Sequence, residues 1–214
     1  MPVTYVDICW TLFSSNTTYD FCRWVKRGDG AVDLPRPGFL KRKFNVLLYR
    51  LTGVDYLRRS FLSVLKGLTR AEIEELARRF CAEYLAGRRI EAVWNALPQG
   101  EKALLSSTLD VIAAAVAAEF GFSRYYGSRL ALDEHGVCLG YIDNDLQGHK
   151  IEQIKLLDGY SIFTDNLSDL PLVAAACSAT IVVYGNRRRW DVALKDAGVD
   201  TSKISFVYAE TARY

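Results

Sequence analysis

The sequence has few of the residues that build disulfide frameworks or zinc sites. Its 214 residues include five cysteines and two histidines, and no two cysteines have the CxxC spacing of zinc and redox motifs. An odd number of cysteines, in a chain large enough to build a hydrophobic core, indicates reduced thiols rather than a disulfide framework. These scarcities argue against a small disulfide-stapled domain and against a structural zinc site.

Long apolar runs are also absent. No stretch approaches the roughly 18 residues that a membrane-spanning helix needs. The opening run Met1-Pro2-Val3-Thr4-Tyr5 lacks the basic and apolar segments of a secretory leader, so we expect a cytoplasmic protein without a transmembrane anchor. Half of the residues are hydrophobic and 24% are charged, which excludes a disordered or low-complexity chain and fits one domain with a modest insertion.

Charge is distributed unevenly along the chain. Between Arg23 and Arg70 there are 12 Lys and Arg against three Asp, a net charge of +9, whereas the whole chain carries +2. Cations alternate with large apolar side chains in 39–50 and 56–62. Two interpretations stay open: a helical surface with a solvated basic face, or a contact with an anionic partner such as a membrane surface. The run Arg187-Arg188-Arg189 is interpreted as solvated, so no nucleic-acid partner is expected.

Strand and helix patterns alternate over most of the chain. The predicted strands are 3–9, 102–105, 160–164, 180–184 and 204–207, with a hairpin of 128–132 and 137–142. The predicted helices are 19–27, 39–66, one that begins after a Thr69–Glu72 capping box, 90–97, 109–120, 150–157, 169–177 and 189–197. This alternation predicts an α/β fold, a three-layer Rossmann-like parallel sheet formed by residues 1–14 and 98–214 and interrupted by an all-helical insertion, residues 15–97.

Polar residues follow several of the predicted strands. Asp7 ends the first apolar run, Ser106 the second and Asp165 the strand after the hairpin. Ligands of open α/β sheets bind beyond the carboxyl ends of the parallel strands, so these side chains should share one edge. Neighbouring carboxylates repel each other, and a divalent cation with a preference for oxygen, such as Mg²⁺, relieves that repulsion.

Four segments in this order resemble the motifs of the haloacid dehalogenase superfamily. They are Asp7-Ile8-Cys9-Trp10-Thr11-Leu12, Leu104-Leu105-Ser106-Ser107-Thr108, Gly148-His149-Lys150-Ile151 and Phe163-Thr164-Asp165-Asn166-Leu167-Ser168-Asp169-Leu170-Pro171. With a helical insertion between the first two, the chain most resembles the phosphoserine-phosphatase-like branch, whose insertion is a small helical cap. The resemblance covers essentially the whole chain.

The resemblance implies a phosphatase reaction with a covalent intermediate. Asp7 is expected to attack phosphorus and form an aspartyl-phosphate, which water then cleaves. Lys150 is expected to neutralise the nucleophile and the transferring phosphoryl group, with Lys155 as a less favoured alternative. The other phosphate contacts implied are Thr11, Ser106 and Ser107, with Ser106 expected at the N-terminus of the following helix.

The resemblance also implies a magnesium site. The expected ligands are the carboxylates of Asp7 and Asp165 and the backbone carbonyl of Cys9, with Asp169 acting indirectly, through a water or by orienting Lys150. Bound there, Mg²⁺ is a Lewis acid and a template for in-line displacement. The expected substrate is a phosphorylated small molecule or a lipid-linked phosphate.

Cys9 departs from the family pattern, which has at this position an aspartate that protonates the leaving oxygen. A thiol with an ordinary pKa near ~8.5 is a poor donor to an alkoxide, and losing a general acid costs about 10²–10⁴ in rate. Three interpretations stay open: substrates with good leaving groups such as acyl or aryl phosphates, a proton from another side chain such as His149, or a catalytically impaired chain that binds a phosphorylated ligand. Trp10, beside the nucleophile, is expected either to contact the substrate or to pack under the cap.

Overall fold

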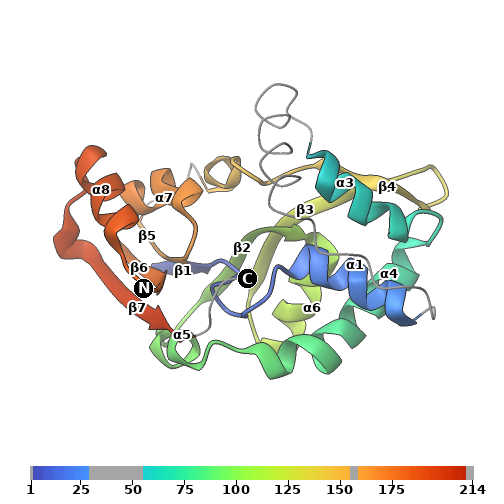
Figure 1. Ribbon diagram of the computed structural model, residues 1–214, viewed down its shortest axis with the longest axis horizontal. Helices are drawn as coiled ribbons and strands as arrows, with labels where there is room; N and C mark the ends of the chain where they lie inside the picture. The colour runs from blue at the N-terminus through green and yellow to red at the C-terminus, as the bar shows by residue number, and fades with distance from the viewer. Residues whose placement is uncertain (1, 29–54, 155–158, 211–214) are drawn as a thin grey trace.

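The computed structural model of the chain describes residues 2–28, 55–154 and 159–210. The strands within these residues are β1 (Val3–Val6), β2 (Lys102–Leu109), β3 (Arg124–Leu132), β4 (Cys138–Asn144), β5 (Tyr160–Thr164), β6 (Ser178–Tyr184) and β7 (Ile204–Ala209). They form one sheet in the order β4-β3-β2-β1-β5-β6-β7 (Figure 1). Neighbouring strands are parallel except β3 and β4, which pair antiparallel, so the predicted α/β fold is confirmed.

The helical elements of the same residues lie between the strands. The α-helices are α1 (Thr17–Gly28), α3 (Tyr56–Leu62), α4 (Arg70–Phe80), α5 (Glu91–Ala96), α6 (Asp110–Phe120), α7 (Leu170–Ala175) and α8 (Arg188–Asp196). The shorter turns are η1 (Ser63–Leu65), η2 (Cys81–Leu85), η3 (Ala86–Arg88), η4 (Lys150–Gln153), η5 (Leu167–Asp169) and η6 (Thr201–Lys203). None of the described helices has the length and apolarity that a membrane crossing requires.

Side chains alternate between the two faces of the sheet and make two hydrophobic clusters. Val6 and Leu104 belong to the cluster that also contains apolar residues of α1, α4, α5 and α6. Tyr5 and Leu105, one residue away in each strand, belong to the cluster that contains apolar residues of α7 and α8. Helices therefore cover both faces, which confirms the predicted three layers (Figure 1).

The insertion between β1 and β2 packs on the first of these faces. Its helices α1, α4 and α5 contribute buried residues to the cluster of Val6 and Leu104. Arg70 at the start of α4 pairs with Asp110 at the start of α6, with 2.9 Å between Arg70 Nη1 and Asp110 Oδ2. The division into a core of 1–14 and 98–214 and a cap of 15–97 stays a prediction, since no separate hydrophobic cluster of the described residues marks it.

Several elements differ from their predicted bounds. β1 stops at Val6 instead of residue 9, because the chain turns there and the Ile8 N–H donates to Asp7 Oδ1 at 2.8 Å. β2 continues to Leu109, beyond the predicted residue 105. The predicted hairpin and the Thr69–Glu72 capping box are present. Of the helix predicted at 150–157, the described part forms the short turn η4.

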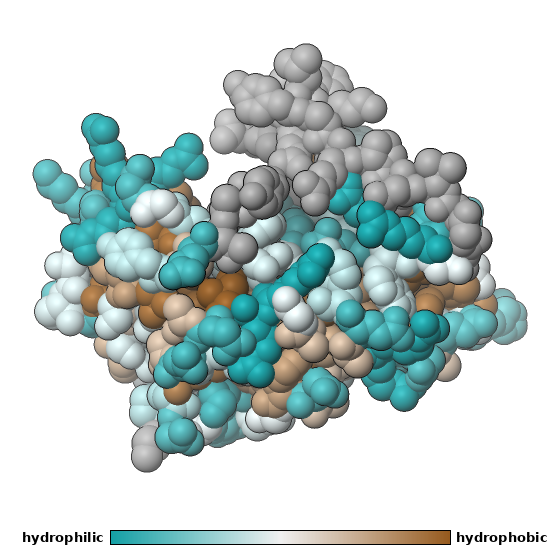
Figure 2. All heavy atoms as spheres, turned by 60° about the horizontal axis from the view of Figure 1, so that its bottom comes forward, coloured by the Kyte–Doolittle hydropathy of each residue, from teal (hydrophilic) through white to brown (hydrophobic). Residues whose placement is uncertain are grey.

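Other predicted features lie outside the described residues. They are 39–54 of the helix predicted at 39–66, residues 155–158, and five of the 12 cations of the basic segment 23–70, namely Arg36, Lys41, Arg42, Lys43 and Arg50. On the face shown in Figure 2, hydrophilic residues cover much of the surface and hydrophobic residues show only as small areas among them.

Candidate functional site

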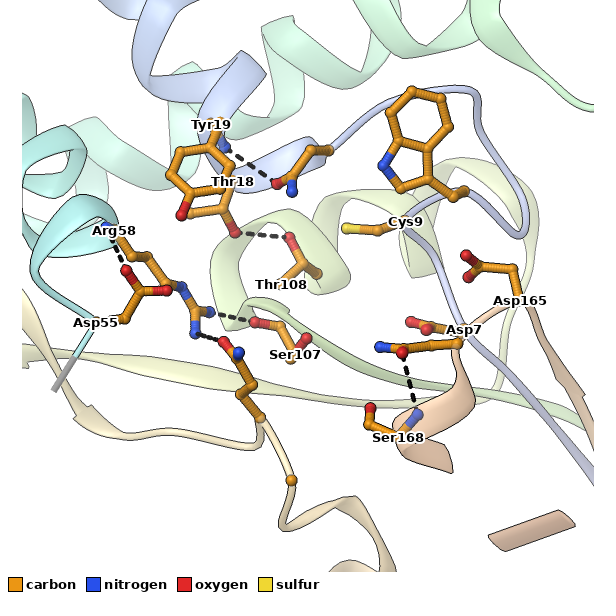
Figure 3. Close-up of a pocket in the computed structure, with 15 residues that line it drawn as sticks. Asp7, Cys9, Thr18, Tyr19, Asp55, Arg58, Ser107, Thr108, Asp165 and Ser168 are labelled. Atoms are coloured by element: carbon orange, nitrogen blue, oxygen red, sulfur yellow. Dashed lines mark hydrogen bonds between the residues drawn. The ribbon is translucent and has the colours of Figure 1, made fainter. Parts of the chain in front are cut away.

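A hollow of about 420 Å³ lies beyond the carboxyl ends of β1, β2 and β5 (Figure 3). Its size is in the range of small-molecule sites. The segments after β1 and β5, the end of β2, the insertion and the connection after β4 all contribute to its walls. The lining residues are Asp7, Cys9, Trp10, Asn16, Thr18, Tyr19, Asp55, Arg58, Ser107, Thr108, Gln147, Gly148, Asp165, Asn166 and Ser168.

Asp7 is buried at one end of this hollow and is held on three sides. Its N–H donates to the carbonyl of Phe163 on β5 at 2.9 Å. Its Oδ1 accepts the Ile8 N–H at 2.8 Å, and its Oδ2 accepts from Lys150 Nζ at 2.8 Å. The carboxylate therefore has a fixed orientation, as a nucleophile requires.

Lys150 lies between two carboxylates. Its Nζ is 2.8 Å from Asp7 Oδ2 and 2.8 Å from Asp169 Oδ2, and all three side chains are buried. Burial by itself lowers the pKa of this ammonium group, but Asp7 and Asp169 outweigh burial and raise the pKa above the usual range for lysine. Lys150 is therefore charged at neutral pH. Its expected alternative, Lys155, lies outside the described residues.

Asp169 faces Lys150 rather than the hollow. Its Oδ2 also accepts from Thr164 Oγ1 at 2.6 Å. Burial raises the pKa of this carboxyl group, and Lys150 opposes that shift. Of the two indirect roles expected for Asp169, orienting Lys150 matches this geometry.

Asp165 lines the hollow together with Asp7. Its Oδ1 accepts from Thr11 Oγ1 at 2.9 Å. Thr11 is fully buried and is not among the lining residues. The structure thus places the Thr11 hydroxyl behind Asp165, as a support for that carboxylate, rather than at the expected position of a phosphate.

The two serines of β2 differ in position. Ser106 is fully buried, and its Oγ accepts the Thr108 N–H at 3.3 Å. Ser107 is the one that lines the hollow. Because β2 continues to Leu109, the expectation that Ser106 lies at the N-terminus of the next helix is wrong: α6 begins at Asp110.

A thiol and three hydroxyl groups form a connected set at Cys9. Cys9 Sγ lies 2.9 Å from Thr17 Oγ1, which lies 2.6 Å from Thr108 Oγ1. Thr18 Oγ1 is 3.4 Å from the same Thr108 oxygen. Burial, and then the charge of Asp7, raise the pKa of the Cys9 thiol. The alternative proton donor, His149, is exposed and lies 3.3 Å from Glu152 Oε1, away from the lining of the hollow.

Sequence reasoning missed Arg58 of α3, a buried cation at the hollow. Its Nη1 is 2.8 Å from Asp145 Oδ1 and 2.9 Å from Oδ2, and its Nη2 donates to the carbonyl of Ser107. Ser128 Oγ lies 3.0 Å from that carbonyl and 3.0 Å from Asp145 Oδ1. Arg58 thus ties the insertion to the end of β2 and to the connection that leads to Lys150. In the sequence, nothing distinguishes Arg58 from its neighbour Arg59.

Trp10 has an unusual backbone. Its φ is 57°, the one positive value at a non-glycine residue among the described parts of the chain. A side chain in this left-handed region costs about 1–2 kcal/mol relative to ordinary conformations. The Trp10 carbonyl accepts from Tyr184 Oη at 2.7 Å, and the two rings meet edge to face, with centroids 6.0 Å apart at 87°. Neighbouring structure thus holds a strained residue three positions after Asp7.

The oxygen donors of the hollow suit magnesium. Asp7 and Asp165 both line it, and the backbone carbonyl of Cys9 follows on the same turn. The described residues contain no group of three or more His, Cys, Asp or Glu side chains able to hold a metal. Two carboxylates and a carbonyl fit Mg²⁺, which keeps several of its waters in protein sites.

Comparisons with known proteins agree with this fold and motif order. The family model of haloacid dehalogenase-like hydrolases matches residues 7–174. Among curated proteins no significant match is found. The fold is similar to that of a Bordetella pertussis Tohama I protein of unknown function, with a TM-score of 0.65 and 15% identity over 95% of this chain and 97% of that one.

Two further solved structures have phosphatase names. A phosphoserine phosphohydrolase-like protein from Francisella tularensis subsp. tularensis SCHU S4 has a TM-score of 0.53 and 15% identity, over 91% of this chain and 93% of its own. A phosphoserine phosphatase in its apo form has a TM-score of 0.51 and 15% identity, over 85% and 86%. At such low sequence identity these structural similarities support the fold alone. The family is shown by the match of residues 7–174: the chain belongs to the haloacid dehalogenase-like hydrolases.

Proposed function

We propose that the chain is a magnesium-dependent phosphomonoester hydrolase that acts through an aspartyl-phosphate on Asp7. The observation that carries the proposal is the pairing of Asp7 with a buried, charged lysine at the end of a hollow that Asp165 also lines. Membership in a family of hydrolases supports the reaction type. The phosphatase names of two similar structures support phosphate monoesters as the substrate class.

In the first step, a carboxylate oxygen of Asp7 attacks phosphorus and forms a new P–O bond. The bond between phosphorus and the leaving oxygen breaks, and the leaving oxygen departs with its electron pair. Lys150, 2.8 Å from Asp7, balances the charge of the nucleophile and of the phosphoryl oxygens. Ser107 lines the same hollow and contributes a hydroxyl group for a phosphoryl oxygen. We infer supporting roles for the other two predicted phosphate contacts: Thr11 holds Asp165, and Ser106 fixes the end of β2.

In the second step, water attacks the phosphorus of the aspartyl-phosphate and the P–O bond to Asp7 breaks. Inorganic phosphate leaves, and the carboxylate is restored for the next cycle. Asp7, Asp165 and the carbonyl of Cys9 would hold Mg²⁺, with Asp169 acting at one remove through Lys150. When bound, the metal supplies a Lewis acid and an orienting charge at the phosphoryl group.

Position 9 shapes the choice of substrate. Because it carries a thiol in place of a carboxylate, we favour substrates whose leaving group departs with little protonation, such as acyl or aryl phosphates. The second candidate is a catalytically impaired relative that binds a phosphorylated ligand or partner, and Cys9 is the observation that favours it. The substitution Cys9→Asp separates the two: the first requires turnover by the wild type, the second turnover only by the variant.

The expected partner is a phosphorylated small molecule held under the helical cap, residues 15–97. A contact between the basic segment 23–70 and an anionic membrane, a cytoplasmic location and a lipid-linked phosphate as substrate all stay predictions. Among the described cations of this segment, Arg58 and Arg70 already pair with Asp145 and Asp110. Co-sedimentation with anionic vesicles at low and high salt tests the membrane contact, and absence of binding at both salt concentrations contradicts it.

The decisive experiment is phosphate release from p-nitrophenyl phosphate and acetyl phosphate by the wild type, with Mg²⁺ and with EDTA. We expect release that requires Mg²⁺ and is abolished in Asp7→Asn. The same variant should no longer incorporate the hydroxylamine-sensitive phosphate that identifies an aspartyl-phosphate. Release that persists in Asp7→Asn would overturn the aspartyl-phosphate mechanism.

A further inference from the structure

Trp10 lies in the wall of the hollow and not in the hydrophobic core. Its neighbours Ile8 and Leu12 are fully buried members of the core cluster on one face of the sheet. Trp10 is half-buried and belongs to neither hydrophobic cluster of the described residues, whereas Trp24 and Trp94 pack against one of them. Of the two roles expected for Trp10, contact with the substrate therefore fits the described residues better than packing under the cap.

The backbone conformation of Trp10 also supports a functional role for its side chain. Glycine adopts a φ of 57° without penalty, so a bulky side chain here is conformationally unfavourable for folding. The surrounding structure nevertheless fixes this conformation: the Trp10 N–H donates to the Phe13 carbonyl at 2.9 Å, and the Trp10 carbonyl accepts from Tyr184 Oη at 2.7 Å. A strained residue held this firmly next to a reactive group indicates a functional side chain.

The rings of Trp10 and Tyr184 belong to two neighbouring hollows. Trp10 lines the one that contains Asp7, and Tyr184 lines a second hollow, of about 720 Å³, beyond β6 and β7. Asp165 and Asn166 line both. Trp10 and Asp7 thus line the same hollow, into which a group attached to a phosphate at Asp7 would extend, and the Tyr184 ring braces the indole edge to face.

We propose that the indole of Trp10 is the binding surface for the leaving group of the substrate, and that this leaving group carries a ring. This inference rests on the proposed phosphatase function and adds the substrate class to it. An aromatic side chain binds the flat face of a ring by dispersion and by excluding water, and it does so with little loss of side-chain entropy. Short acyclic phosphates lack such a face.

The test uses two ligands that cannot be hydrolysed and differ only in the ring. Binding of phenylphosphonate and methylphosphonate is measured by calorimetry with Mg²⁺ in the wild type, Trp10→Ala, Trp10→Phe and Trp24→Leu. We expect the wild type to prefer phenylphosphonate by about tenfold or more. In Trp10→Ala that preference should fall below about threefold, with the affinity for methylphosphonate nearly unchanged. Trp10→Phe should restore most of it, and Trp24→Leu should retain all of it, because Trp24 lies outside the hollow.

Each outcome decides the proposal. Equal binding of the two phosphonates by the wild type, no binding of either, or a preference that survives in Trp10→Ala overturns it. The assay needs no turnover, so it fails independently of the proposed function. Hydrolysis of phosphate esters without a preference for phenylphosphonate would support the proposed function and contradict the subsite at Trp10. A preference for phenylphosphonate that depends on Trp10, without phosphatase activity, would support the subsite and contradict the proposed function.

Discussion

Lys150 Nζ lies 2.8 Å from Asp7 Oδ2, and both side chains are buried. The contact joins η4 to the residue that follows β1, although the two residues are 143 positions apart in the sequence. It converts a buried carboxylate, which by itself is unfavourable, into half of an ion pair at the wall of the hollow. Asp169 on the opposite side of Lys150 is a second carboxylate partner, which would remain beside the ammonium group in the aspartyl-phosphate that we propose on Asp7.

Replacing Lys150 with Met should abolish most of the activity. Asp7 and Asp169 would then face each other without a cation, and the phosphoryl oxygens would lose their nearest positive charge. We expect kcat to fall by about 10²–10³ or more, measured as phosphate release under saturating Mg²⁺. Lys195→Met on α8, an exposed lysine outside the hollow, is the matched control and should keep wild-type kcat. Retention of more than a tenth of wild-type kcat in Lys150→Met contradicts the role given to this lysine.

The Arg58–Asp145 pair should contribute to stability as well as to the shape of the hollow. Removing the cation in Arg58→Met leaves Asp145 and the Ser107 carbonyl with fewer partners, so we expect a loss of about 1–3 kcal/mol in the free energy of unfolding. Asp145 is 33% exposed at its side chain, which keeps the loss below that of a fully buried pair. Urea denaturation of Arg58→Met, Asp145→Asn and the double variant measures the coupling free energy between the two side chains.

The adjacent arginine is the control for that experiment. Arg59 is exposed and lies over the ring of Tyr141, with 5.1 Å between Arg59 Cζ and the ring centroid. We expect Arg59→Met to cost less than about 1 kcal/mol. Equal losses for the two arginines, or additive effects of Arg58→Met and Asp145→Asn, would show that the buried pair has no special contribution.

The cysteines should differ sharply in reactivity. Burial raises the pKa of Cys22 to about 12 and that of Cys81 to about 12, and the thiolate is the reactive form. At pH 8 both are therefore protonated as well as inaccessible, while Cys177 is exposed. Because the shift is upward, raising the pH to 9 should still leave Cys22 and Cys81 almost entirely as thiols.

Intact mass after iodoacetamide treatment checks this prediction. In the native protein we expect rapid labelling of Cys177 and none of Cys22 or Cys81, and in urea labelling of all five cysteines. Fast modification of Cys22 or Cys81 in the native state would mean that the helices of the insertion open far more readily than their buried side chains indicate.

The sequence predicted features that depend on local pattern. The alternation of strand and helix patterns was enough to predict the parallel sheet. The carboxylates at the ends of predicted strands were enough to predict that Asp7 and Asp165 lie at one edge of the sheet. The position of Lys150 came from the family resemblance, because its neighbours in space are distant in sequence. The roles of these residues stay predictions, although the structure brings the three to the same end of the hollow.

Features that depend on tertiary contacts could not be predicted. Arg58 and Arg59 have the same local environment in the sequence, and only the packing of α3 decides which one is buried against Asp145. β2 extends past Ser106, and its register with β3 shifts between Leu105 and Leu109; no local pattern in the sequence indicates such an irregularity. The positive φ of Trp10 is equally invisible, since tryptophan gives no signal of a left-handed turn.

The strain at Trp10 can be measured with two substitutions that both remove the indole. Trp10→Ala keeps a Cβ in the left-handed conformation, whereas Trp10→Gly does not, so their difference isolates the backbone. Alanine also stiffens the unfolded chain relative to glycine, which favours the alanine variant by about 0.4–1 kcal/mol where the native conformation is unstrained. At φ 57° the penalty of about 1–2 kcal/mol for a Cβ exceeds that benefit.

Trp10→Gly should therefore unfold at a higher temperature than Trp10→Ala. A net difference near 1 kcal/mol corresponds to about 2–4 °C in Tm for a chain of this size, which calorimetry resolves. Both variants should lose the preference for ring-bearing ligands, because neither has an indole. A glycine variant less stable than the alanine variant would mean that the turn at Trp10 is unstrained. Backbone strain would then no longer support a role for the Trp10 side chain in the hollow beside Asp7.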